Sequence, residues 1–437
     1  MRCVVKLLML AVLLTGAGLR ADSANNYLNP PRTLPTPYGL KILRSSDVRL
    51  VQEESDLPVA GLSLGRYLDS IEDAELNDGA YSADLSEPLE DIGRAFQAQD
   101  QHSEAMSFFR RALHLSRINE GLYCANQLPA LNGIIDSQMA MGRVSDADEN
   151  QKYRYRVQSH VYEAGDQGFL DATMEYSEWQ RTAYLDGLGD ETYLRLLDIY
   201  EMHKGEIERI RNKGENDPAL LLHLGWQIRA EYLLSQYEGE KQAEVQISIS
   251  SGLDAQFAFN TSLEMVRFKK IKNNNFRNGR NALEEIVEML AEREEPDLVA
   301  LAEAKIALGD WYLWWDRLSR ARQCYEEAYA LLQNDSEPAT DPRSLFAGNV
   351  ELPEEPIFHP GAITLRSDRQ ARAVVLFNIS LHGRVRDVQI VQMYPDETMG
   401  ARIALLKMLK EFRFRPHVED GKLAAVEAVV REYNFEY

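Results

Sequence analysis

The chain has few cysteines and no grouping of metal-ligating residues. Only three of its 437 residues are cysteine, and Cys3 lies ahead of the first apolar run. Cys124 and Cys324 are far apart, and such cysteines rarely meet in a helical array, so we expect two separately packed thiols. The eight histidines are scattered, with no two at the i, i+4 spacing. The sequence therefore predicts no metal site.

Signatures of catalysis are also scarce. The sequence contains no G-x-x-x-x-G-K-[ST], no H-E-x-x-H and no C-x-x-C. These motifs carry nucleotide-dependent, metal-dependent and redox chemistry. We therefore predict that the protein is not an enzyme, that it has no catalytic residue and that it needs no cofactor.

The longest early apolar run is too short to cross a membrane. Arg2 and Lys6 precede the run Leu7–Leu14, and small residues follow it. A helix needs about 20 apolar residues to span a bilayer. We expect residues 1–21 to be a cleaved signal peptide. The mature chain would then be periplasmic, without an integral membrane span; the alternative is that this segment stays as an inner-membrane anchor.

Negative charge predominates and is unevenly distributed. The net charge is −21, of which residues 22–371 carry −25 and residues 372–437 carry +1. An acidic body repels nucleic acid and anionic lipid. We therefore expect protein or peptide partners and no nucleic acid.

Two segments share one helix-turn-helix pattern. In both, a glycine precedes an alanine by 12 residues, and a second alanine follows after 7 more. Small residues at these places let antiparallel helices approach closely, and aromatic residues fill the space between them. The positions are Leu89, Ile92, Gly93, Phe96, Ala105, Phe109 and Ala112, and then Leu308, Gly309, Tyr312, Ala321, Tyr325 and Ala328.

This pattern resembles the tetratricopeptide repeat family, with weaker copies in between. We predict an all-α helical solenoid over residues 86–334, preceded by a proline-rich, largely irregular lead-in over 22–85. The glycines of His160–Gly189 indicate a loop or an irregular hairpin there.

The resemblance implies a partner-binding groove on the first helix of the last repeat. Trp311, Trp314 and Trp315 lie on that helix, and either Trp314 anchors a peptide or all three pack against neighbouring helices. The positions that would face the groove are Glu303, Ile306, Asp310, Leu313 and Trp314.

A second proline-bearing stretch ends the helical pattern. We predict a linker over residues 335–363, crossed by few contacts, and a separate domain over 364–437. In that domain, two alternating runs flank Gly383, an amphipathic segment covers Thr398–Lys410, and a long final strand ends at Tyr437. The order predicts a three-stranded antiparallel sheet with one helix on its face.

The last segment resembles the TonB C-terminal domain. The resemblance rests on Gly383 in its turn, on the aromatic-x-aromatic-x-proline run Phe412–Pro416 and on the Asp420-Gly421-Lys422 turn. It implies recognition of an extended partner segment by strand addition at the sheet edge. The edge positions implied on the last strand are Val426, Ala428, Val430, Glu432 and Asn434.

Together these features predict an α+β multidomain protein, a tetratricopeptide-type helical solenoid followed by a small TonB C-terminal-like α+β domain. The expected function is a non-catalytic periplasmic scaffold or adaptor, with partners such as an outer-membrane transporter or an envelope complex. The alternative is a membrane-anchored TonB-type energy transducer coupled to outer-membrane transport. The short linker and the absence of a histidine in Leu7–Leu19 disfavour it. A third interpretation is an envelope-glycan binding protein that uses the tryptophan helix.

Overall fold

The structure is a computed structural model, and it is mostly helical. It describes residues 79–189, 192–214, 218–237, 255–333, 348–353, 370–395, 399–419 and 421–437, with Ile71, Asp73, Glu75, Leu76 and Phe346. These residues form twelve α-helices, a three-stranded antiparallel sheet and a two-stranded sheet. The predicted signal peptide, most of the predicted lead-in and most of the predicted linker lie outside the described residues. The α+β multidomain class is confirmed.

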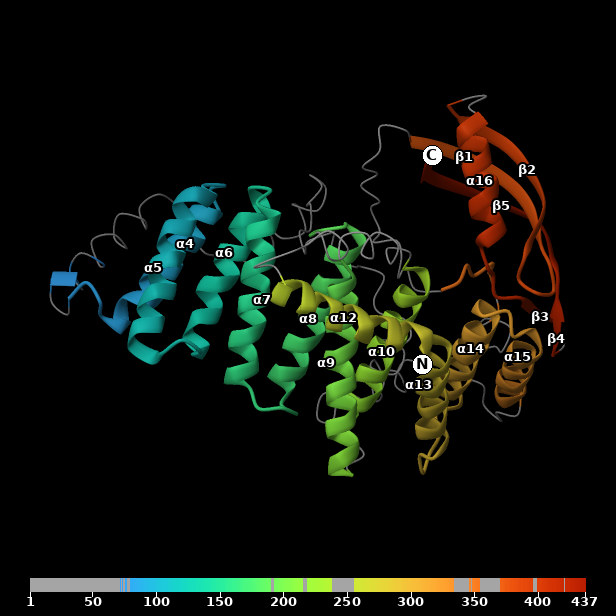
Figure 1. Ribbon diagram of the computed structural model, residues 1–437, viewed down its shortest axis with the longest axis horizontal. Coiled ribbons are helices and arrows are strands. Elements are labelled where there is room, and N and C mark those ends of the chain that lie inside the picture. Colours follow the sequence, from blue (N-terminus) through green and yellow to red (C-terminus); the bar gives the residue numbers. More distant parts are fainter. Residues whose placement is uncertain are drawn as a thin grey trace, which may run out of the picture. The chain divides into compact units, whose positions relative to one another are not determined.

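The described chain forms two compact units, divided between Arg195 and Leu196. The first unit is an array of helices in which consecutive members pack side by side (Figure 1). Its helices are α4 (Ser86–Gln97), α5 (His102–Glu120), α6 (Leu128–Ala140), α7 (Val144–Val161) and α8 (Gln167–Leu185), with short 3₁₀ helices at Ala83–Leu85 and Ala125–Gln127.

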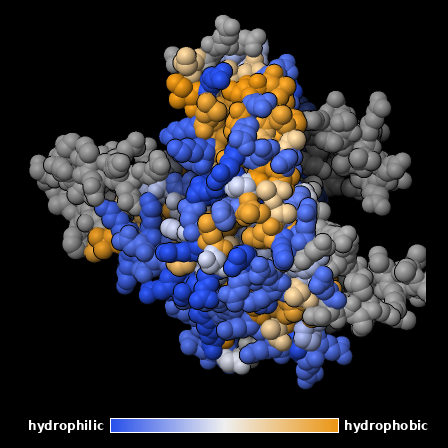
Figure 2. All heavy atoms as spheres, turned by 90° about the vertical axis from the view of Figure 1, so that its right-hand side faces the viewer, coloured by the Kyte–Doolittle hydropathy of each residue, from blue (hydrophilic) through white to orange (hydrophobic). Residues whose placement is uncertain are grey.

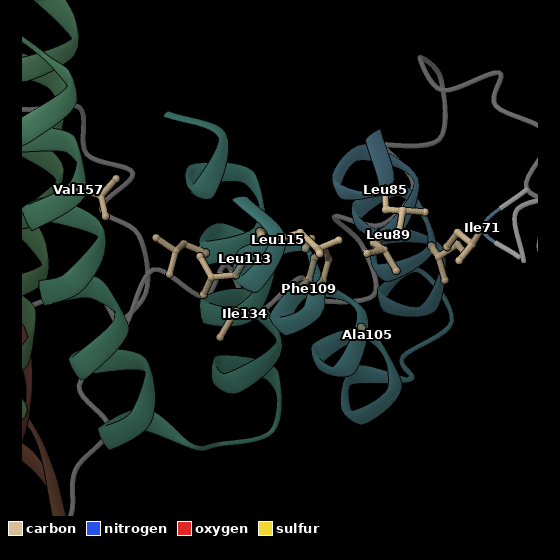
Figure 3. Packing of buried hydrophobic residues seen from close by; sticks show 13 residues of the cluster. Ile71, Leu85, Leu89, Ala105, Phe109, Leu113, Leu115, Ile134 and Val157 are labelled. Carbon is tan, nitrogen blue, oxygen red and sulfur yellow. The ribbon is translucent and has the colours of Figure 1, made fainter. Parts of the chain in front are cut away.

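The core of the first unit follows the predicted repeat pattern. Phe109 of α5 is fully buried, and it lies between α4 and α6 at the two points where those helices carry glycine. A Cβ added to Gly93 or to Gly133 would lie 2.6 Å or 2.4 Å from the Phe109 ring. Glycine therefore makes room for the aromatic ring on both sides. Figure 3 shows how Leu85, Leu89, Ala105, Phe109 and their neighbours meet in this core.

The prediction of a loop over His160–Gly189 is wrong. This segment contains the 19-residue helix α8, which buries Tyr176, Trp179 and Ala183. Three of its glycines lie outside the helix and have positive φ, namely Gly165, Gly187 and Gly189. They end the adjoining segments instead of breaking the helix, because a positive φ costs glycine nothing.

The second unit begins with further helices. Asp297 caps α14 by accepting hydrogen bonds from the backbone N–H groups of Val299 and Ala300 at 3.0 and 3.1 Å. Helix α13 packs between α10 and α14, and α15 packs on α14. The helices are α9 (Thr192–Lys213, which begins in the first unit), α10 (Ala219–Gln236), α12 (Ala255–Asn273), α13 (Asn275–Ala291), α14 (Leu298–Trp314) and α15 (Leu318–Gln333).

Gly309 brings α14 and α15 together as the repeat pattern predicts. A Cβ at Gly309 would lie 2.6 Å from the ring of Tyr325, which is fully buried. Gly205, on the exposed side of α9, has nothing within 4 Å of the same point. The two helical glycines therefore differ in the space around them.

We expect Gly309→Ala to destabilise the protein by about 1–3 kcal/mol, because the added methyl group overpacks the helix interface. Gly205→Ala is the matched control, and it should stabilise by about 0.5–1 kcal/mol because alanine loses less conformational freedom in a helix. Urea unfolding of both variants measures the difference. Equal free energies of unfolding for the two variants would contradict the close approach at Gly309.

The C-terminal module, residues 370–437, is a sheet covered on one face by a helix. The central strand β1 pairs antiparallel with β2 on one side and with β5 on the other. Helix α16 buries Ala401, Leu405 and Leu409 against β1 residues such as Val375 and Phe377. Its elements are β1 (Gln370–Ile379), β2 (Val385–Tyr394), α16 (Met399–Glu411), β3 (His417–Glu419), β4 (Lys422–Ala424) and β5 (Val426–Glu436).

Gly383 occupies the turn between β1 and β2, as predicted. Its φ is +67°, and an added Cβ would lie 2.1 Å from the carbonyl oxygen of Phe414. The backbone N–H of Phe414 donates to the Gly383 carbonyl at 2.8 Å. Both the backbone conformation and the close approach of the second chain segment therefore require glycine here.

Candidate protein-binding surfaces

Strand β5 is an edge of the three-stranded sheet. One side of β5 pairs with β1 from Gln370↔Glu436 to Ile379↔Val426. The other side has no strand partner among the residues that the structure describes. An unpaired edge presents backbone N–H and C=O groups to which an extended segment can hydrogen bond.

Three of the five predicted edge residues share one exposed row. Val430 is 62% exposed, and Glu432 and Asn434 are exposed beside it. They alternate with Val429 and Phe435, which are buried under α16, as expected for a strand with one covered face. Glu432 also accepts a hydrogen bond from Arg372 of β1 at 2.7 Å.

The other two predicted residues differ because the strand is irregular. The pairing register shifts between Phe377 and Ile379, and Ala428 opposite this shift has a φ of +57°. Its backbone N–H donates to the Asn378 side chain at 3.0 Å. A one-residue irregularity reverses which face the next side chain points to. Val426 therefore packs against the core instead of joining the exposed row.

The helix-covered side of β5 is flanked by a second chain segment, residues 348–353. Arg431 donates to the carbonyl of Asn349, and the Tyr433 hydroxyl donates to Glu351 at 3.4 Å. Burial raises the pKa of Glu351, although Arg431 opposes the shift. The backbone of this segment pairs with residues 413–415 instead of β5, so it does not cover the strand edge.

The five predicted groove residues all lie on α14, but most are not accessible. Ile306, Asp310 and Leu313 are buried, with exposed fractions of 3%, 4% and 1%. Glu303 is half-buried, as is Trp314, whose indole N–H donates to Ser235 at 3.0 Å. This part of the predicted groove is therefore filled by side chains of the chain itself.

The tryptophans pack against neighbouring helices. Trp311 is fully buried, and its indole N–H donates to the Phe276 carbonyl at 3.1 Å. Trp314 meets Tyr232 of α10 edge to face, with ring centroids 5.5 Å apart, and Trp315 packs on Phe276 of α13. These contacts match the packing alternative for the tryptophan helix.

Asp310 is held by the C-terminal module. Arg415 donates to both carboxylate oxygens, from Nε at 3.1 Å and from Nη2 at 2.5 Å. Both side chains are only 6% exposed. The hydroxyl of the buried Tyr325 donates to Asp310 Oδ1 at 2.8 Å, and burial, followed by the charge of Asp310, raises the pKa of Tyr325 well above its usual range. Tyr325 and Arg415 thus bind one carboxylate from two directions.

Further contacts extend this interface. Asp316, just after α14, receives a hydrogen bond from Arg384 and lies 3.5 Å from Arg413 Nε. Phe346, inside the predicted linker, is buried against Tyr325. The expectation that few contacts cross the linker is therefore wrong. The sequence did not show it, because Asp310 and Arg415 are 105 positions apart and neither belongs to a local motif.

The described residues contain no cluster of three side chains suited to a metal ion, and none of their helices has the length and apolarity needed to span a membrane. The chain matches no protein-family model, and no curated protein matches it.

Proposed function

We propose that the chain is a non-catalytic adaptor of the periplasm whose C-terminal module binds an extended segment of a protein partner. The observation that supports this most is the side of β5 that has no strand partner in the described part of the chain, bordered by the exposed Val430, Glu432 and Asn434. The resemblance to the TonB C-terminal domain supports the same surface. Other functions of that family, including energy transfer to an outer-membrane transporter, are not part of the proposal.

Binding at β5 would combine two kinds of contact. Backbone hydrogen bonds along the edge give affinity without regard to sequence, and side chains on alternate positions give selectivity. On the exposed face, Val430 continues an apolar row with Leu376 of β1, its cross-strand partner, and Glu432 adds a negative charge. A partner strand with an aliphatic residue beside Val430 and a basic residue beside Glu432 would complement this face.

The helices would serve as the scaffold for a second partner, as in tetratricopeptide repeat proteins. On α14 the accessible part of the predicted groove is reduced to Glu303 and Trp314, both half-buried. Asp310 and Leu313 instead contact the C-terminal module, Asp310 through Arg415 and Leu313 beside Gly383. Stacked helical arrays require a cap at their end, and the module provides one here.

We expect a photo-crosslinking amino acid at Val430 to capture a partner in cells, because an added strand would lie beside this residue. Val391 of β2 is the matched control, since it is 64% exposed against 62% for Val430 but lies on a different strand. Gel shifts and mass spectrometry of the adducts measure capture. Adducts at Val391 alone, or equally at both positions, would contradict binding at β5.

A further inference from the structure

Helix α16 carries apolar side chains on two opposite faces. Its inner face, Ala401, Leu405 and Leu409, is buried in the core of the C-terminal module. On its outer face, Met399 is 70% exposed, Ile403 61% and Leu406 40%. A helix that packs on one side only normally keeps its outer face polar.

The outer apolar residues form one stripe along the helix. Met399, Ile403 and Leu406 follow the i, i+4, i+7 spacing, which places them above one another on the same face. Seven of the fourteen large hydrophobic side chains that are exposed among the described residues belong to the C-terminal module. Figure 2 shows hydrophobic side chains gathered in the upper part of the view, where this module lies. A contiguous exposed stripe of this kind marks an interaction surface.

Basic residues flank the stripe. Arg402, Lys407 and Lys410 are exposed, and Glu411 at the end of α16 is the helix's single acidic residue. At 100° per residue, Arg402 lies to one side of the stripe and Lys407 to the other, with Lys410 at its end. The surface is therefore apolar along its centre and positively charged around it.

This charge pattern decides between possible occupants. A second copy of α16 would bring three basic residues against three more, and like charges at an interface oppose association. A sheet of anionic lipid would attract α16 but would repel residues 22–371, which carry a net charge of −25. A partner helix with a few carboxylates around an apolar stripe fits the local charge and the linear shape of the surface.

We propose that the outer face of α16 binds an acidic amphipathic helix of a partner protein. Aliphatic side chains of that helix pack along Met399, Ile403 and Leu406, and its carboxylates pair with Arg402, Lys407 and Lys410. Helix-on-helix packing of this kind uses i, i+3, i+4, i+7 anchors on both partners. The surface is separate from the β5 edge, so it does not depend on strand addition there.

The test uses the full-length protein and a labelled synthetic peptide of about 18 residues, or five helical turns. The peptide has leucine at i, i+3, i+4 and i+7 and glutamate at the flanking positions, and a twin peptide carries lysine in place of glutamate. Fluorescence anisotropy measures binding. We expect the acidic peptide to bind at least about tenfold more tightly than its basic twin, which is a difference of about 1.4 kcal/mol.

Two variants locate the binding. Ile403→Asp should weaken binding of the acidic peptide at least about tenfold. The double variant Lys407→Glu, Lys410→Glu should reverse the preference in favour of the basic twin. Val391→Asp on β2 is the control, and it should leave both affinities unchanged. All four positions are exposed, and circular dichroism checks that each variant is folded.

Four results of the peptide measurements would overturn the proposal. They are equal binding of the two peptides, no binding of either, binding that survives Ile403→Asp, and a preference that the double charge variant does not reverse. Vesicles of phosphatidylglycerol and sedimentation of the protein alone test the other occupants. Vesicle binding or self-association that Ile403→Asp abolishes would assign the stripe to lipid or to a second copy instead.

Discussion

Replacing Asp310 with alanine is expected to destabilise the second unit by about 3–5 kcal/mol. The change leaves the Arg415 guanidinium, only 6% exposed, without the carboxylate that binds it through two nitrogen atoms. The Tyr325 hydroxyl also loses its acceptor in a fully buried position. Removing one member of a buried ion pair costs far more than the pair itself contributes. Urea unfolding of the full chain measures the loss.

Asp316 is the matched control for this prediction. Its side chain is 54% exposed and also lies beside two arginines, Arg384 and Arg413. Asp316→Ala should cost less than about 1 kcal/mol, because solvent screens an exposed pair. The double variant Asp310→Leu, Arg415→Met should cost less than Asp310→Ala, since it leaves no buried charge. Similar losses for Asp310→Ala and Asp316→Ala would show that the Asp310–Arg415 pair is not buried in solution.

The second large effect concerns Glu231 of α10 and the pH dependence of stability. Glu231 is fully buried, and Asn275 of α13 donates to its carboxylate and to its backbone carbonyl. Glu231 Oε1 and Asn275 Oδ1 have no hydrogen-bond partner among the residues that the structure describes. Burial raises the pKa of Glu231 to about 8, although the amides of Asn278 and Asn275 oppose the shift.

The sign of the effect follows from the two protonation states. Between the ordinary value of 4.5 and about 8, the folded protein holds a proton on Glu231 that the unfolded chain has released. The stability that this proton gives is complete below pH 4.5 and is lost as the pH rises through 8. Within that window the free energy of unfolding decreases by up to about 1.4 kcal/mol for each pH unit.

Glu231→Gln should remove this part of the pH dependence, because glutamine is neutral at every pH and keeps the shape of the protonated acid. The difference in melting temperature, wild type minus variant, should therefore decrease as the pH is raised from 5 to about 8. Glu201→Gln, at an exposed position of α9, is the control and should follow the wild type. A wild-type profile parallel to that of Glu231→Gln would contradict the buried neutral carboxyl.

Local patterns in the sequence predicted much of the fold. The alternating apolar residues around Gly383 gave two paired strands, and Gly383 itself has the predicted positive φ. The matched glycines Gly93 and Gly309 both contact the aromatic residue of the following helix, as their spacing predicts. These features depend on residues a few turns apart, where backbone geometry limits the alternatives.

The remaining features depend on longer-range contacts or on single irregular residues. The positive φ of Ala428 reverses which side chains of β5 point to the covered face of the sheet. The sequence Val426-Glu427-Ala428 contains no residue type that predicts a positive φ. The glycines around α8 indicated a loop, because the sequence alone does not show that three of them lie beyond the helix ends. Asp310 looked like a groove residue, but its partner Arg415 lies in another domain of the sequence.

A partner strand added at the β5 edge would form hydrogen bonds with the backbone amides of β5, and hydrogen exchange of these amides detects such bonds. The full-length protein is compared alone and bound to the partner captured from Val430. Strand addition predicts slower exchange at alternate amides of β5, because only every second N–H points to the open edge. It predicts unchanged exchange along β2. Unchanged exchange along β5 in the complex, or protection confined to β2, would contradict strand addition at β5.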